Sequence, residues 1–174
     1  MSEEAFFIDE QTSFAIDLTA MTMDAVLSPV YHREFGLKPA EVNILLILSE
    51  EGICTQGTLI RRTGTYKMAV SRFVRRLEDR NLVCRAAYDG RADYWRLSVD
   101  GVQVSSRAIE TIQGFEATIL SGLSDDERRL VRDLLRRIRV AGKAACERPK
   151  MRRRYKTANF GLGSVRGGAP KIPA

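Results

Sequence analysis

Apolar residues recur along the first part of the chain with the spacing of α-helices. A stripe repeating at i, i+4, i+7 and i+11 predicts one long helix within residues 10–34, and it consists of Phe14, Leu18, Met21 and Ala25. Pro39 suits the first position of a second helix, predicted over residues 39–50, and Gly52 ends it. Both helices carry an apolar side that must pack against another element.

Two shorter helices follow around a glycine turn. The first is predicted over residues 56–62 and ends at Gly64, and Thr65 is expected to cap the second, over residues 66–80, through its hydroxyl. The second helix has an apolar core side made of Val70, Phe73, Val74 and Leu77. Its opposite arc collects Met68, Ser71, Arg72, Arg75 and Arg76, with Lys67 and Ala69 near the edges. A helix, a turn and a helix in this order are typical of a helix-turn-helix motif.

The segment after these helices has the composition of two β-strands. Residues 82–88 and 93–99 are rich in Val, Tyr, Trp and Leu, and an Asp-Gly turn signal lies between them. This pattern predicts a β-hairpin with Arg91 at its tip.

Two more amphipathic helices complete the pattern. Ser98 is expected to cap a long helix that ends near Gly122 and whose apolar residues include Val102, Ile109, Ile112, Phe115 and Ile119. Ser124 and Glu127 have the spacing of a capping box, which predicts a last helix with a stripe formed by Leu130, Val131, Leu134, Leu135 and Ile138.

Charge is distributed unevenly along these elements. Residues 1–60 carry two bases and ten acids, whereas residues 61–96 carry ten bases and four acids. Residues 147–174 carry eight further bases with one acid. Arginines are also common on helix faces that only meet solvent. The arginine-rich arc of residues 66–80 could therefore be an ordinary exposed surface with no binding role.

Composition narrows the class of protein. A chain of 174 residues with 44% hydrophobic content can bury one core, so we expect one domain with tails. No run approaches the ~18 apolar residues of a membrane span, and the acidic N-terminus lacks the layout of a secretory signal, so we expect a cytoplasmic protein that does not enter membranes. Three widely spaced cysteines, read as reduced thiols, and one histidine provide neither a disulfide framework nor metal-ligand spacing. Without a catalytic set or a phosphate-binding loop, we expect no enzyme activity and no cofactor.

Three motifs in the middle of the chain resemble one family. The stretch LIRRTGTYKMAVSRFVRRLEDRNLVCR is similar to the second and recognition helices of MarR (multiple antibiotic resistance regulator) transcription factors. Asp89 and Arg91 match the Asp-x-Arg motif of that family's wing, and LSVDG resembles the Leu-Thr/Ser-x-x-Gly opening of its fifth helix. The resemblance covers about residues 10–143. Met68 and Tyr66 depart from it, because the family often has small or polar residues there.

The resemblance implies a mainly α fold with a small β-hairpin wing. It implies a homodimeric, sequence-specific regulator of transcription, by default a repressor, that binds a pseudo-palindromic double-stranded DNA site and is released by a small ligand. We therefore divide the chain into four parts: an N-terminal dimerisation helix (residues 1–36), a winged helix-turn-helix module (37–99), C-terminal dimerisation helices (100–146) and a basic tail (147–174). The apolar stripes could instead pack on one another within one subunit.

Candidate DNA contacts follow from the exposed arc and the wing. Ser71 and Arg72 suit base edges in the major groove, since arginine pairs bidentately with guanine. Phosphate partners are expected to be Lys67, Arg75 and Arg76, and the full predicted set also includes Thr65, Met68, Asp89 and Arg91. Arg91 could enter the minor groove with Asp89 orienting an arginine, although Asp89 and Gly90 can also form a turn and nothing more.

An effector site is expected between the winged module and the dimer helices, where this family is known to hold aromatic acids. Tyr31, His32, Phe35 and Tyr66 are the predicted lining for a small aromatic or phenolic effector, although a lone histidine is also often structural. Cys54, in a helix connection, and Cys84, in a strand, are interpreted as inert thiols, with redox sensing as the alternative.

The tail at residues 147–174 has no helical periodicity and is interpreted as an extended or disordered arm. It either adds phosphate contacts or only increases solubility. A rival function is therefore a non-specific nucleic-acid-binding or protein-interaction module that depends on this tail.

Overall fold

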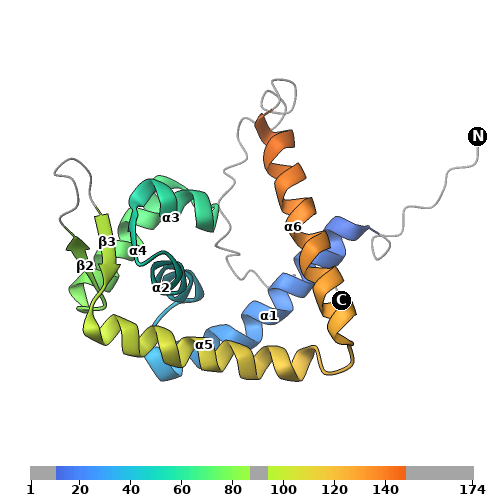
Figure 1. The fold of residues 1–174 in the computed structure, drawn as a ribbon, viewed down its shortest axis with the longest axis horizontal. Helices are drawn as coiled ribbons and strands as arrows, with labels where there is room; N and C mark the ends of the chain where they lie inside the picture. Colours follow the sequence, from blue (N-terminus) through green and yellow to red (C-terminus); the bar gives the residue numbers. More distant parts are fainter. Residues whose placement is uncertain (1–10, 87–93, 148–174) are drawn as a thin grey trace, which may run out of the picture.

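The fold is taken from a computed structural model, which describes residues 11–86 and 94–147. Within these ranges the chain is mainly helical with one small antiparallel sheet, as the sequence predicts (Figure 1). In chain order the elements are α1 (Thr12–Phe35), α2 (Pro39–Glu51), β1 (Ile53–Thr55), α3 (Gln56–Thr63), α4 (Lys67–Asp79), β2 (Val83–Ala86), β3 (Tyr94–Leu97), α5 (Val99–Ile119) and α6 (Asp125–Glu147).

The sheet has the order β1-β3-β2, and both pairings are antiparallel. In the register, Cys54 of β1 and Arg85 of β2 flank Trp95 of β3. The hairpin of β2 and β3 confirms the predicted strands in the described residues, but β1 corrects the expectation that Cys54 lies in a plain helix connection. Three residues are too few to show the period-2 alternation that identifies a strand.

Helix α2 forms the centre of the core. Val42, Ile44 and Leu45 are fully buried, and α2 packs against α1, α3, α4, α5 and the sheet. The other elements contribute one face each, through residues such as Leu59, Val70, Leu77, Val83 and Trp95. This packing orients α3 and α4 as a helix-turn-helix pair beside the strands (Figure 1).

Several helix ends form where the sequence predicts them. Gly64 ends α3 in the left-handed conformation, with φ of 69°. The Ser98 Oγ accepts a hydrogen bond from the Gly101 backbone N–H at the start of α5. At α6, the Ser124 backbone N–H donates to Glu127 and the Glu127 backbone N–H donates back to the Ser124 Oγ, which confirms the capping box.

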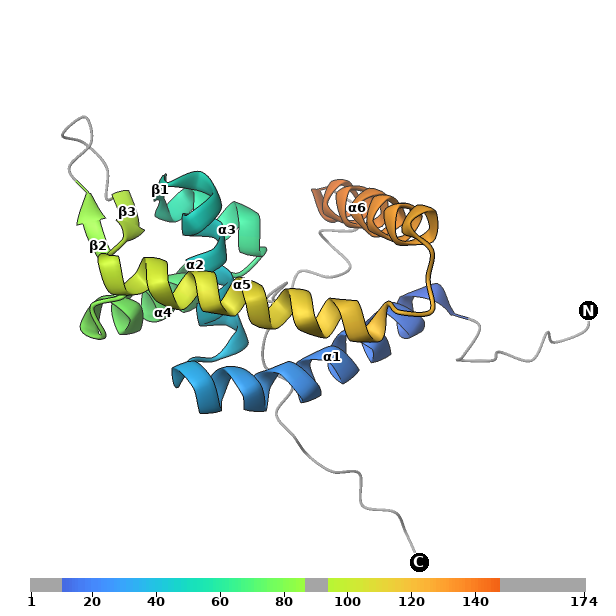
Figure 2. The same cartoon turned by 60° about the horizontal axis from the view of Figure 1, so that its bottom comes forward.

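The long helices extend away from this compact part. Helix α5 runs along the winged module, α1 passes beneath α5, and α6 turns back and stands apart from α2, α3 and α4 (Figure 2). The apolar stripe of α6 therefore remains open, with Leu134 41% and Leu130 56% exposed. Among the described residues, no helix combines the length and apolar character needed to span a membrane.

Candidate nucleic-acid interface

Helix α4 is buried on one side and open on the other. Val70, Val74 and Leu77 lie in the core, as the sequence predicts, and Ala69 is buried with them rather than lying at the edge of the open arc. The predicted contacts Lys67, Met68, Ser71, Arg72 and Arg75 are all exposed. Met68 is 75% exposed, which is unusual for a large apolar side chain and leaves it free to contact a partner.

The start of α4 differs from the prediction. Its N-cap residue is Tyr66, and no side chain caps this end. Thr65 is buried, and its backbone N–H donates to the Thr63 Oγ1 over 3.2 Å. The helix starts one residue later than predicted, so Thr65 does not cap it. The DNA contact predicted for Thr65 remains a prediction, and little of its side chain is exposed.

Gln56 joins the exposed face of α4 from the neighbouring helix. Its side-chain amide donates a hydrogen bond to the Ser71 Oγ, which links the first turn of α3 to the middle of α4. Sequence reasoning missed Gln56, because 15 residues separate it from Ser71 and no helical period connects them. Its position directly after the cap residue Thr55 is the one signal that could have drawn attention to it.

The arginines of α4 fall into two groups. Arg72 and Arg75 make no ion pair with the described residues, and the Arg72 guanidinium lies 5.5 Å from the centre of the Phe73 ring. Arg76, by contrast, lies with its Nε 3.2 Å from the Oε1 of Glu41, a carboxylate that is 1% exposed. That oxygen makes no hydrogen bond within the described part of the chain, so Arg76 is the charge that compensates it. The structure therefore gives Arg76 a role inside the protein that its predicted phosphate contact did not include.

The C-terminal end of α4 is attached to the end of α1. Arg80 donates from Nη2 to the Phe35 carbonyl over 2.7 Å and from Nη1 to the Gly36 carbonyl over 2.8 Å. These carbonyls belong to the last turn and cap of α1, where backbone acceptors lack helical partners. Two arginines one helical turn apart, Arg76 and Arg80, thus hold α4 against the corner between α1 and α2.

The wing can be described only at its base. Arg85 of β2 lies over the Trp95 ring at 5.0 Å and 3.6 Å from the Glu78 carboxylate of α4, which joins the strands to that helix. The predicted contacts Asp89 and Arg91 lie outside the described residues.

The four predicted effector residues differ in burial. Tyr31 and Phe35 are buried in the core with their ring centres 6.3 Å apart, His32 is exposed, and Tyr66 is 46% exposed rather than in the core. Burial raises the pKa of the Tyr31 hydroxyl, and the nearby Asp24 carboxylate adds to this rise. These residues remain a prediction as an effector site.

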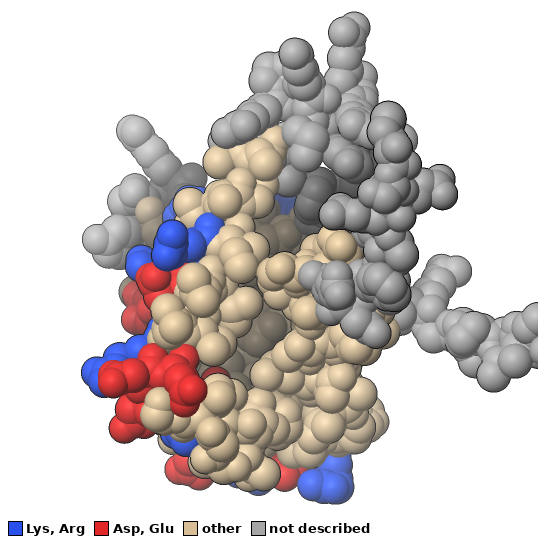
Figure 3. Space-filling model, turned by 90° about the vertical axis from the view of Figure 1, so that its right-hand side faces the viewer, with Lys and Arg blue, Asp and Glu red and all other residues tan. Residues whose placement is uncertain are grey.

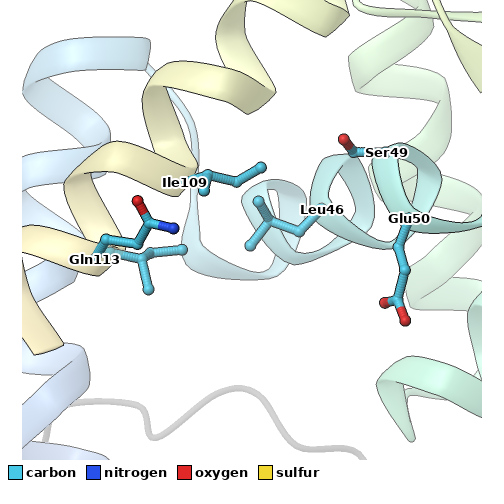
Figure 4. A pocket seen from close by; sticks show the side chains of 6 residues that line it. Leu46, Ser49, Glu50, Ile109 and Gln113 are labelled. Carbon is cyan, nitrogen blue, oxygen red and sulfur yellow. The ribbon is translucent and has the colours of Figure 1, made fainter.

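A separate hollow of about 310 Å³ lies between α2 and α5. In Figure 4, the side chains of Leu46 and Ile109 point toward one another across it, whereas the Glu50 carboxylate points away. Its lining is mostly apolar, and none of the four predicted effector residues takes part in it. The described residues also contain no group of three or more His, Cys, Asp or Glu side chains arranged for a metal ion.

Comparisons with known proteins place this geometry in one fold. Residues 35–92 match the model of the MarR family. The chain is similar to a MarR/EmrR family transcriptional regulator from Acinetobacter sp. ADP1, with a TM-score of 0.73 and 23% identity over 80% of this chain and 99% of that one. A search of curated proteins finds no match.

Two further solved structures are similar at lower identity. One is Bordetella bronchiseptica BpsR, whose structure concerns regulation of DNA binding by 6-hydroxynicotinic acid, with a TM-score of 0.68 and 20% identity over 76% of this chain and 96% of that one. The other is S. aureus MepR in complex with DNA, with a TM-score of 0.66 and 17% identity over 76% of this chain and 97% of that one. The fold is that of MarR-family transcriptional regulators, which confirms the resemblance seen in the sequence.

Proposed function

We propose that this chain, which has the MarR-family winged-helix fold, is a sequence-specific, double-stranded DNA-binding regulator of transcription. The observation that carries the proposal is the open face of α4, where Lys67, Ser71, Arg72 and Arg75 are exposed while the opposite face is anchored in the core. A rigid helix with a row of outward donors suits the major groove, where base edges present acceptors. The similarity to MepR, which is solved with DNA, supports the same use of the fold.

The individual contacts follow from what each side chain does inside the protein. Ser71 and Arg72 are the proposed base contacts, and Lys67 and Arg75 the proposed phosphate contacts. Arg76 is 45% exposed and could still reach a phosphate, but its charge is shared with Glu41. Met68, at 75% exposed, could offer an apolar contact such as that with a thymine methyl group. Asp89 and Arg91 remain proposed wing contacts.

The chain is also proposed to act as a homodimer through α1, α5 and α6. Apolar side chains on all three helices are open to solvent, among them Leu18 and Met21 of α1, Ile119 of α5, and Leu134 and Ile138 of α6. Figure 3 shows the side of the molecule where α6 and the first half of α1 lie. Among the described residues, the centre of this face is mainly uncharged. A second copy would cover these stripes and set two α4 helices about 34 Å apart, one turn of DNA.

Repression and release by a small aromatic or phenolic effector complete the proposal. A dimer bound across a promoter blocks polymerase, which makes repression the simplest outcome. BpsR, whose DNA binding is regulated by 6-hydroxynicotinic acid, supports an effector of this chemical class.

Selection from a random duplex library tests the proposal. The full-length protein should enrich a two-fold symmetric site and bind it about 10³-fold or more tightly than a scrambled duplex at physiological salt. Affinity for both duplexes should fall with added salt, because counterions are released from phosphates. Equal affinity for the enriched and scrambled duplexes would instead favour a non-specific module that depends on the basic residues at 147–174.

A further inference from the structure

The hydroxyl of Ser71 is engaged by a side chain, whereas several other hydroxyls on the helices of this protein bond to their own helix. Thr19, Thr22 and Ser106 each donate their hydroxyl proton to the backbone carbonyl four residues earlier, over 2.7, 2.8 and 3.0 Å. A helical serine or threonine commonly does this when nothing else engages it. Within the described residues Ser71 makes no such bond, and its partner is the side-chain amide of Gln56.

The geometry points to Gln56 as a positioning residue that fixes which hydrogen bond Ser71 can make to DNA, an inference that rests on the proposed function. A serine hydroxyl has one donor hydrogen and two acceptor lone pairs. The Gln56 amide N–H occupies an acceptor position of the Ser71 Oγ. The Ser71 hydroxyl proton then remains available for a partner outside the protein.

The helix pair holds Gln56 in place for this role. Thr55 is the N-cap of α3, and its Oγ1 accepts from the Thr58 backbone N–H over 3.2 Å, which fixes the first turn. Gln56 is the first residue of that turn, and α3 packs directly against α4. The donor amide is therefore presented from a fixed backbone to a side chain on the open face of α4.

The chemical consequence is a preference at the base pair facing Ser71. A fixed hydroxyl donor favours base edges that present an acceptor in the major groove, namely guanine N7 and O6, adenine N7 and thymine O4. If the Gln56 amide is removed, the Ser71 hydroxyl is free to rotate and donate to the Lys67 carbonyl, as Ser106 does to Val102. Discrimination at that base pair would then be lost without loss of the fold.

A double-mutant cycle tests this inference with full-length protein and the duplex enriched from the library. Gln56→Met keeps the length of the side chain and removes its amide, and Ser71→Ala removes the hydroxyl. Each single variant should lose roughly threefold to tenfold in discrimination at one base pair, the scale of a single hydrogen bond. The double variant should lose no more than either single variant, because both act through the same contact.

Gln56→Glu provides a readout that a purely structural role would not change. A carboxylate only accepts, so the Ser71 hydroxyl would donate to Glu and present its lone pairs outward. The preferred base at that position should shift toward a donor, such as cytosine N4 or adenine N6. As a matched control, Gln103→Met changes an exposed glutamine of α5 and should leave the base preference unchanged.

The outcomes separate this inference from the function on which it rests. If the losses of Gln56→Met and Ser71→Ala multiply in the double variant, Gln56 contacts DNA independently and the positioning role is wrong. An unchanged base preference in both Gln56 variants would also overturn it while leaving the proposed function intact. A wild-type protein that does not distinguish the enriched duplex from a scrambled one would overturn both.

Discussion

Arg76 of α4 lies 3.2 Å from the buried Glu41 carboxylate of α2, and this pair joins the candidate DNA-binding helix to the centre of the core. The other oxygen of Glu41 accepts from the Lys38 backbone N–H over 2.9 Å, which satisfies the start of α2. A carboxylate that is 1% exposed needs such compensation, because desolvation penalises its charged form. One arginine on the polar arc of α4 therefore compensates a buried charge, even though 45% of its side chain is exposed.

Arg76→Ala should lower the free energy of unfolding by roughly 1–3 kcal/mol, because it leaves the Glu41 charge uncompensated. The Arg76 side chain is 45% exposed, so water limits the loss. Arg75→Ala is the matched control one residue earlier, and it should change stability by less than about 0.5 kcal/mol. Chemical denaturation of both variants at equal protein concentration measures the difference. Equal stabilities would contradict a structural role for the pair.

Arg72→Ala and Arg75→Ala should affect DNA binding in different ways. Loss of Arg72 should remove about 1–3 kcal/mol of discrimination between the enriched and scrambled duplexes, because a base contact carries sequence information. Loss of Arg75 should weaken binding to both duplexes and reduce the salt slope by about one. Titrations at several salt concentrations distinguish the two effects. If Arg72→Ala retains full discrimination, α4 does not meet the groove as proposed.

Gly101→Ala should destabilise the protein, because a Cβ at that position would lie 1.9 Å from the Leu82 carbonyl oxygen. Relieving this clash requires α5 to move away from the residues that precede β2, at a cost of roughly 1–3 kcal/mol or more. Gly114→Ala, on the same helix, meets nothing within 4 Å and should stabilise α5 by about 0.5–1 kcal/mol. Thermal unfolding at fixed concentration should thus shift in opposite directions for the two variants.

Cys54 should be the slower of two thiols to react at pH 8. Burial raises the pKa of the Cys54 thiol from 9.0 to about 11, and the nearby Glu51 carboxylate adds to the rise. At pH 8 only about one Cys54 side chain in a thousand is then a reactive thiolate. Cys84 is less buried than Cys54. Iodoacetamide labelling followed by peptide mass spectrometry should therefore find Cys84 modified before Cys54.

The same thiol gives a pH dependence of stability. The unfolded chain loses the Cys54 proton near pH 9, whereas the folded chain retains it until about pH 11. The free energy of unfolding should therefore fall as pH rises between these values, since the unfolded state binds fewer protons there. Cys54→Ala should make this part of the pH profile shallower. An identical profile for the variant and the wild type would contradict the prediction.

Leu134→Glu on α6 should disrupt the proposed homodimer. Leu134 belongs to the open stripe of α6, and a charge there would have to be desolvated beneath a second copy. Arg132→Glu places the same side chain on an exposed polar position of that helix and serves as the control. Light scattering after size-exclusion chromatography should show a halved mass for Leu134→Glu alone. A wild type that is already monomeric would refute the dimer.

Local sequence signals predicted most of the fold because they are short-range. The apolar period located α1, α4, α5 and α6, and proline and glycine signals bounded α2 and α3. Hydroxyl caps at Ser98 and Ser124 marked two of the helix starts. Each signal depends on residues within one or two helical turns. The same period separated the core side of α4 from its open arc, apart from Ala69.

What could not be predicted depends on tertiary neighbours. Helical spacing places Arg76 on the polar arc, but it does not reveal the partner Glu41, which is distant in sequence. The burial of Glu41 is set by the packing of α2. The bond between Gln56 and Ser71 arises only when α3 and α4 are in contact. Helical spacing therefore separated the open arc of α4 from its core side but did not distinguish free side chains from those already engaged.

The two bonds from Arg80 to the end of α1 have a mechanical consequence. Helix α1 has 24 residues and a length of roughly 36 Å, and its last carbonyls accept hydrogen bonds from the Arg80 guanidinium at the end of α4. A displacement of this end of α1 therefore acts on Arg80, at the C-terminal end of α4. In the proposed dimer, a movement between subunits that displaces this end of α1 would reach the candidate DNA-binding helix through these two hydrogen bonds.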